Sequence, residues 1–295
     1  MKKMMSAACA AVMGCALPAA QAGGHYVAGV EGLQAASVPP PGTYYLGYLV
    51  HYDIDSFRAP DSSEALPGDN SGSVTALTNR LVWISPHQVL GADWGMEAIV
   101  PVLHKSLDLG AIGFDESDSG VGDVYLGPLV LGWHGPRWDA VVSAGLWLDN
   151  ASSDTPDSPG HGYRSTMLTL GGTLYADESR SASASALLRY EINGDTDAGF
   201  EPGSQVTLEW GVGKQLGPLQ LGLVGYEQWQ VSRDEGPGAS GARSSRHGLG
   251  AEVAWPRMDI GLTVKGALYR EYRAEGGSGP EPRGSLLRLT LIKAF

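Results

Sequence analysis

After its first fifteen residues the sequence contains no cysteine, because Cys9 and Cys15 are its only two. A disulfide framework and a thiolate metal site are therefore excluded from the rest of the chain. Basic residues are also scarce, with 20 Lys and Arg against 32 Asp and Glu and a formal net charge of -12. Nucleic-acid binding needs a basic surface that displaces counterions from phosphates, so this balance excludes a general nucleic-acid binder.

Long apolar runs are missing too. Beyond the N-terminal region no stretch of eighteen apolar residues occurs, which excludes a transmembrane helix. The strands of a transmembrane barrel produce no such run, because lipid-facing apolar residues alternate with polar residues that face the lumen. The period of the hydrophobic pattern therefore decides between a soluble protein and a barrel in a membrane.

The first 22 residues have the layout of a secretory signal peptide. Lys2 and Lys3 precede an apolar run that ends at Ala20-Gln21-Ala22, a cleavage site of the small-x-small type. We expect a signal peptide at 1–22 and a mature, exported chain from Gly23. The alternative is a lipoprotein signal that leaves Cys15 acylated, but it shortens the apolar run and leaves the cleavage site unexplained.

A period of two runs through the remaining chain and is clearest at 182–192, where apolar residues alternate with Ser, Arg and Glu. A helical period would scramble these two sets. The same test applied throughout predicts about twelve strands. They span residues 43–55, 74–84, 94–104, 121–133, 138–148, 165–175, 182–192, 205–214, 219–231, 247–255, 258–272 and 285–295.

The connections alternate in length, which a soluble sandwich does not explain. Polar loops of about 12 to 18 residues follow odd-numbered strands, the second of them at 105–120, and turns of about 2 to 9 residues follow even-numbered ones, the first at 85–93. Tryptophans gather where strands meet the short turns, as in a girdle at a membrane interface. They are Trp83, Trp94, Trp133, Trp138 and Trp255.

Together these patterns predict an all-β protein, a transmembrane antiparallel β-barrel of about 12 strands over residues 43–295. The chain ends within a strand at Phe295, an ending that resembles the C-terminal signal presented to the outer-membrane barrel-assembly machinery. Residues 23–42 lack the period of two. We expect them to form either a periplasmic extension or a plug inserted in the barrel.

Two segments resemble a known family, the outer-membrane transporter-like proteins associated with the meta pathway of phenol degradation. The first is GHYVAGVEG at 24–32, followed by PPPGTYY at 39–45. The second is GVGDVY at 120–125, followed by Pro128 and by GWHG at 132–135. The resemblance implies a bacterial outer-membrane barrel suspected of passing hydrophobic compounds, and it brings no catalytic residues.

Little in the sequence indicates catalysis or a metal. The seven histidines include no pair at metal-ligand spacing, so we predict neither a metal site nor a cofactor. Outer-membrane phospholipases are also twelve-stranded barrels with a Ser and His on the wall, and His104 and Ser106 are the one local hint of such a site. Nucleophilic catalysis needs a positioned base and an orienting partner that the sequence does not display.

Charged residues in the predicted strands are more informative, because a charge that faced lipid would cost roughly 2 to 4 kcal/mol. Alternation therefore places six of them in the lumen. They are Arg189, Glu191, Glu209, Glu252, Lys265 and Arg288. These side chains either pair with one another to hold the wall or line an aqueous path and set its selectivity.

The function that we expect is passage of small, hydrophobic or aromatic molecules across the outer membrane by a protein that is not an enzyme. Its expected partners are outer-membrane lipids and lipopolysaccharide, the assembly machinery at the C-terminal strand, and small hydrophobic solutes, with no nucleic acid. The alternatives are a structural or enzymatic barrel with a closed lumen, and a soluble periplasmic binding protein.

Overall fold

The structure is a computed structural model that describes residues 23–110 and 112–295. The expected signal peptide and Cys15 lie outside these residues. The described chain forms thirteen strands and one short 3-10 turn, η1 at Met258–Ile260. The strands are β1 Gly42–Arg58, β2 Asn70–Val89, β3 Ala92–Leu109, β4 Phe114–Val121, β5 Tyr125–His134, β6 Trp138–Trp147, β7 Ser165–Tyr175, β8 Ala182–Asn193, β9 Gln205–Leu216, β10 Leu219–Gln230, β11 Ser245–Arg257, β12 Leu262–Glu275 and β13 Glu281–Ala294. Among the described residues, no helix is long and apolar enough to cross a membrane.

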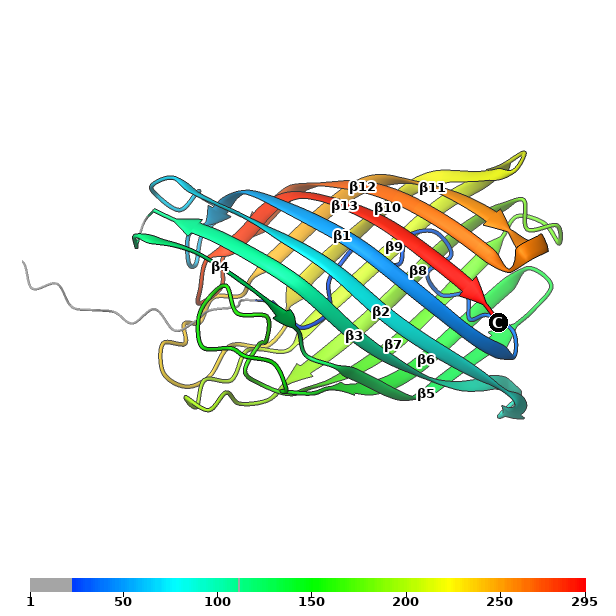
Figure 1. Ribbon diagram of the computed structural model, residues 1–295, viewed down its shortest axis with the longest axis horizontal. Helices are drawn as coiled ribbons and strands as arrows, with labels where there is room; N and C mark the ends of the chain where they lie inside the picture. Colours follow the sequence, from blue (N-terminus) through cyan, green and yellow to red (C-terminus); the bar gives the residue numbers. More distant parts are fainter. Residues whose placement is uncertain (1–22, 111) are drawn as a thin grey trace, which may run out of the picture.

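Twelve of the described strands close into an antiparallel barrel (Figure 1). Each pairs with its neighbours along the chain, and β1 joins the last strand, so that Tyr44 lies opposite both Ala294 of β13 and Val82 of β2. The ring is completed on the other side by pairing of β3 with β2 and with β5. The predicted fold class is confirmed.

The two faces of the wall differ as the period of two requires. On β13, Leu287, Leu289 and Leu291 are 48%, 49% and 42% exposed, whereas the intervening Arg288 is fully buried. Successive side chains of a strand point to opposite faces. Along this strand the outer face is therefore aliphatic and the charge of Arg288 lies inside. Nearer the long loops the outer face also carries charge, as in the exposed ion pair of Asp55 on β1 with Arg270 on β12.

Two predicted connections are wrong in detail. The turn expected at 85–93 is mostly strand, because β2 and β3 are joined only by Leu90 and Gly91. Both residues have positive φ, 54° and 73°, as a two-residue hairpin turn of the favoured kind requires. Residues 258–260, expected as the start of a strand, form η1 instead.

The fourth predicted strand, 121–133, is interrupted, and most of the loop predicted at 105–120 is strand. The chain turns back after β3 and forms β4, which pairs with the outer half of β3 from Val102 to Leu109. It then breaks at residues 122–124 and continues as β5 along the inner half of β3. The outer half of this hairpin has no apolar face, since β4 is largely exposed on both sides, and the hydrophobic pattern therefore could not reveal it.

Residues 23–41 lie inside the barrel, and we call them the lumen segment. The blue chain runs between the walls in Figure 1. Leu33 and Ala36 are each 1% exposed, and Leu33 packs in one cluster with Tyr48 of β1 and Tyr269 of β12. Val38 packs in a second cluster with Val130 of β5 and Val141 of β6, across the ring from β12. The segment therefore crosses the lumen and does not line one wall alone.

Candidate functional site

Three glutamates of the wall bind the backbone of the lumen segment. Glu191 of β8 accepts hydrogen bonds from the backbone N–H groups of His25 and Tyr26, at 2.8 and 3.3 Å. Glu209 of β9 accepts one from the backbone of Glu31, at 3.0 Å, and Glu252 of β11 accepts one from Leu33, at 3.2 Å. A segment without regular structure needs partners for its backbone groups, and these carboxylates supply them.

Three cations of the wall bind the same segment. Arg189 donates to the Tyr26 hydroxyl and to the Glu31 carboxylate, both at 2.7 Å. Lys265 donates to the carbonyl oxygens of Glu31 and Leu33, at 3.1 and 2.9 Å. Arg288 donates to the carbonyl oxygen of Gly29, at 2.7 Å.

The six charged residues predicted for the lumen thus all contact the lumen segment, and five of them are also paired with one another. Lys265 Nζ lies 3.1 Å from Glu252 Oε1, and Arg288 forms a short ion pair with the other oxygen of the same carboxylate. Arg189 lies 3.9 Å from Glu209. The three cations thus balance the three glutamates of the wall, and all six side chains hold the lumen segment in place.

Sequence reasoning missed a part of this network. Arg80 of β2 donates to Glu31 at 2.9 Å and also contacts Glu97 of β3. Arg80 lies in a predicted strand whose alternation is poor, and Glu31 lies in a segment with no period, so the pattern could not assign either residue to the lumen. Glu31 is therefore the point where cations from β2, β8 and β12 meet the segment.

A cavity of about 620 Å³ lies between the lumen segment and the wall, toward the short turns. Much of its lining is apolar and comes from the segment itself and from facing strands. These lining residues include Ala36, Val38, Leu46, Val130, Val141 and Leu187. A volume of this size suits a small organic molecule, since ligand pockets usually measure about 300 to 1,000 Å³.

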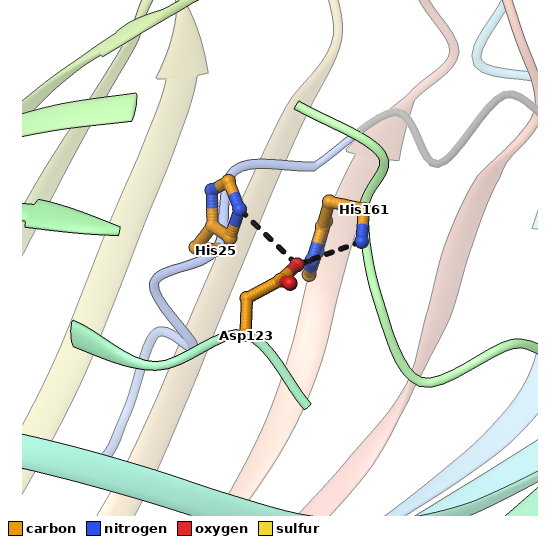
Figure 2. Close-up of side chains that lie close together, drawn as sticks. All are labelled: His25, Asp123 and His161. Carbon is orange, nitrogen blue, oxygen red and sulfur yellow. Dashed lines mark hydrogen bonds and ion pairs between the residues drawn. The ribbon is translucent and has the colours of Figure 1, made fainter. Parts of the chain in front are cut away.

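At the end of the barrel with the longer loops, His25, Asp123 and His161 come together (Figure 2). His25 belongs to the lumen segment, Asp123 to the break between β4 and β5, and His161 to the loop between β6 and β7. Asp123 Oδ1 accepts hydrogen bonds from the backbone N–H groups of Asn150 and Ala151, both at 3.0 Å, and Oδ2 accepts one from His161, at 2.8 Å. One carboxylate thereby ties the break in the wall to the loop.

The two imidazoles in this cluster have different charges. Burial opposes protonation of His25, but its contacts with Asp123 and Glu191 outweigh that effect and raise its pKa to about 9. Burial and the neighbouring charge of His25 lower the pKa of His161 to about 4. Near pH 7 the cluster therefore holds its positive charge on His25, between two carboxylates.

Replacing Asp123 by alanine should free the loop between β6 and β7. Asp123→Ala removes the acceptor of three backbone N–H groups, so local opening becomes easier. We expect trypsin to cleave after the exposed Arg164 about tenfold faster, as followed by mass spectrometry of the folded protein. Asp154→Ala, in the same loop but on its surface, is the matched control. Equal rates in both variants would show that Asp123 does not hold the loop.

His104 and Ser106, the local hint of a phospholipase site, do not form a catalytic pair. The ring of His104 shares a hydrogen bond with the hydroxyl of Ser119 on β4, at 2.8 Å. Both His104 and Ser119 are exposed. The contacts of the described site are hydrogen bonds and ion pairs centred on the lumen segment.

The sequence matches a known family, and the fold is similar to that of solved outer-membrane proteins. Residues 54–278 match the family described as "Putative MetA-pathway of phenol degradation". Among solved structures, the chain is similar to the COG4313 outer membrane channel from Pseudomonas putida F1, with 15% sequence identity, a TM-score of 0.77 and coverage of 90% of this chain and 100% of that one. The beta domain of the Bordetella autotransporter BrkA is more distant, with 13% identity, a TM-score of 0.46 and coverage of 86% and 99%. Among curated proteins, none matches the sequence.

The structural likeness shows the fold, a β-barrel of the bacterial outer-membrane type. The aliphatic outer surface contradicts the alternative of a soluble periplasmic binding protein. The family match covers most of the chain and includes the predicted GVGDVY segment. The chain therefore belongs to this family, as the resemblance at 120–135 predicted, while the resembling segments at 24–45 precede the matched residues.

Proposed function

We propose that this protein passes small hydrophobic or aromatic molecules across the outer membrane. The observation that carries the proposal is the cavity between the lumen segment and the wall, much of whose lining is apolar. An open aqueous pore would expose its charged wall to water, whereas here the six lumen charges bind one another or the segment. A hydrophobic solute gains free energy in such a cavity, and a hydrated ion does not.

The charges around this cavity give it a polar rim. Arg80, Glu97 and Lys265 border it where the segment crosses the lumen, and Asp139 and Arg180 border it near the short turns. A few polar groups in a mostly apolar pocket fix the orientation of a ligand. This arrangement supports a solute with an apolar body and one polar group, as in a phenol.

A bulky side chain in the cavity should slow uptake. Ser143 of β6 lines the cavity, and Ser143→Trp would fill part of it. In Gram-negative host cells that lack the protein otherwise, we expect the initial rate of 1-N-phenylnaphthylamine entry, measured by fluorescence, to fall about fivefold or more relative to the unaltered chain.

The matched control is Val142→Trp, one residue along the same strand and on the opposite face. It adds the same side chain to the lipid side of the wall, and the rate should stay unchanged at equal amounts of protein in the outer membrane. A rate that is independent of the cavity variant, or that equals the rate of cells without the protein, would contradict the proposed transport.

We also propose that the C-terminal strand is the part that the barrel-assembly machinery binds. β13 ends next to the chain terminus with alternating outward leucines, and it pairs with β1 at the seam of the ring. The aliphatic outer surface fits the lipid of the outer membrane. Contacts of loop carboxylates such as Asp149 and Asp154 with lipopolysaccharide would need divalent cations, since both carry negative charge.

A further inference from the structure

The cluster of His25, Asp123 and His161 brings three potential metal ligands to one point. His25 Nε2 and His161 Nδ1 each lie 3.4 Å from the same atom, Asp123 Oδ2, and one atom from each residue lies within 4.8 Å of the others. Zinc binds nitrogen and oxygen ligands in a tetrahedron with bonds of about 2.0 to 2.2 Å, which places neighbouring ligand atoms roughly 3.3 to 3.6 Å apart. The two measured separations agree with this spacing.

His25 is oriented as a metal-ligating histidine usually is. Its Nδ1 lies 2.8 Å from Glu191 Oε1, and Ser165 donates to the same oxygen at 2.7 Å. A ring N–H donated to a carboxylate leaves the other nitrogen free to bind a metal. That other nitrogen, Nε2, is buried and receives no hydrogen bond from any described residue, although it is directed at Asp123.

Asp123 is held in the same way by an outer layer of donors. The backbone N–H groups of Asn150 and Ala151 bind Oδ1, and Oδ2, which accepts the backbone N–H of His161 at 2.8 Å, is turned toward the two rings. Ligating carboxylates are typically fixed by such hydrogen bonds. The rings also pack against aromatic neighbours, since His25 stacks on Trp147 and both His25 and His161 meet Tyr163 edge to face.

The donor set selects the class of metal. Two imidazoles and one carboxylate suit zinc and its neighbours in the first transition series, whereas calcium and magnesium prefer sites made only of oxygen. His161 is 22% exposed at its side chain, so an ion can enter from the loop side and can take water as its fourth ligand. A bound ion would take the place of the proton on Nε2 of His25, while the proton on Nδ1 stays directed at Glu191.

We propose that His25 Nε2, Asp123 Oδ2 and His161 Nδ1 form a site for a zinc-type divalent metal ion. The ion would join the lumen segment, the break between β4 and β5, and the loop between β6 and β7. Sequence reasoning saw no metal site, because these ligands lie on three separate segments, and Asp123 and His161 are 38 residues apart. Metal-ligand spacing in a sequence indicates a site only where the ligands lie on one helix, strand or loop.

The test is a titration of the full mature chain, folded in detergent and stripped with EDTA, with Zn²⁺ in a calorimeter. We expect one ion per chain, and His161→Ala should weaken binding by more than the roughly 10- to 100-fold that loss of an outer-layer partner costs. His104→Ala removes an exposed histidine at the same end of the barrel and should leave the affinity unchanged. Ca²⁺ and Mg²⁺ should not compete.

Glu191→Gln is the second variant, since it keeps the shape of the side chain that orients His25. We expect it to weaken Zn²⁺ binding by roughly 10- to 100-fold. Co²⁺ should give the intense visible absorption of a four-coordinate site in the unaltered chain and not in His161→Ala, provided that circular dichroism shows both folded. Absence of stoichiometric Zn²⁺ binding, or equal affinity in His161→Ala and His104→Ala, would overturn the proposal.

Discussion

Deletion of residues 24–38 should raise the ion conductance of the barrel by at least about tenfold. An eight-stranded barrel is just filled by its own side chains, and a twelve-stranded one is wider. Here the lumen segment occupies the extra space, with Leu33 and Ala36 each only 1% exposed. Without the segment, water and ions gain a continuous path along the charged wall.

Single-channel recording in a planar bilayer measures this directly, beside the full mature chain. Gly32→Ala provides a second variant that retains the whole segment. Gly32 has a φ of +68°, and a Cβ there would collide with the carboxylate of Glu252 and with Arg288, so the middle of the segment must move. We expect a conductance between those of the full chain and the deletion. Equal, low conductance in all three folded proteins would show that the segment does not close the lumen.

Replacing Glu252 by glutamine should destabilise the barrel by about 3 to 5 kcal/mol. Arg288 is fully buried, and its charge is balanced by Glu252, which also pairs with Lys265. Glutamine keeps the size of the side chain and an acceptor for the backbone of Leu33 but leaves two cations without their counter-ion. Removing one partner of a buried pair costs far more than the pair itself contributes.

Urea-induced unfolding in lipid vesicles, followed by tryptophan fluorescence, gives the change in the free energy of unfolding. Asp259→Asn is the control, because Asp259 pairs with Arg257 in the exposed η1 region, and it should leave the unfolding midpoint where it was. The double variant Glu252→Gln with Arg288→Met should regain part of the loss, since it removes the fully buried cation and leaves only Lys265 without its counter-ion. A full loss in the double variant would mean that the charge imbalance is not the cause.

The barrel could be predicted because its outer wall obeys one simple rule. Lipid on one face and a polar lumen on the other impose a period of two on every spanning strand, and the six lumen charges follow from the same alternation. The period of two is not required in the parts of the strands that extend beyond the lipid. β4 and the outer half of β3 lie among polar loops, where no apolar face is required, and the predicted loop at 105–120 was therefore wrong.

The lumen segment and the histidine cluster obey no period. Residues 24–32 adopt their path because wall residues far along the chain bind them, and a single sequence does not say which distant residues meet. Asp123, for example, binds backbone N–H groups of Asn150 and His161, which lie in the loop between β6 and β7. Which residue each of them contacts is determined by the closed barrel, and the neighbouring residues in the sequence do not reveal it.

Closure of the ring also fixes an order of events in folding. The contact of Arg288 with Gly29 joins residues 259 apart in sequence, and contacts of such separation form late, because the chain entropy must be overcome first. β13 supplies both this contact and the seam with β1. The same strand thus completes the wall and anchors the segment inside it, so the assembling protein need not pass through a stage in which a closed barrel has an empty lumen.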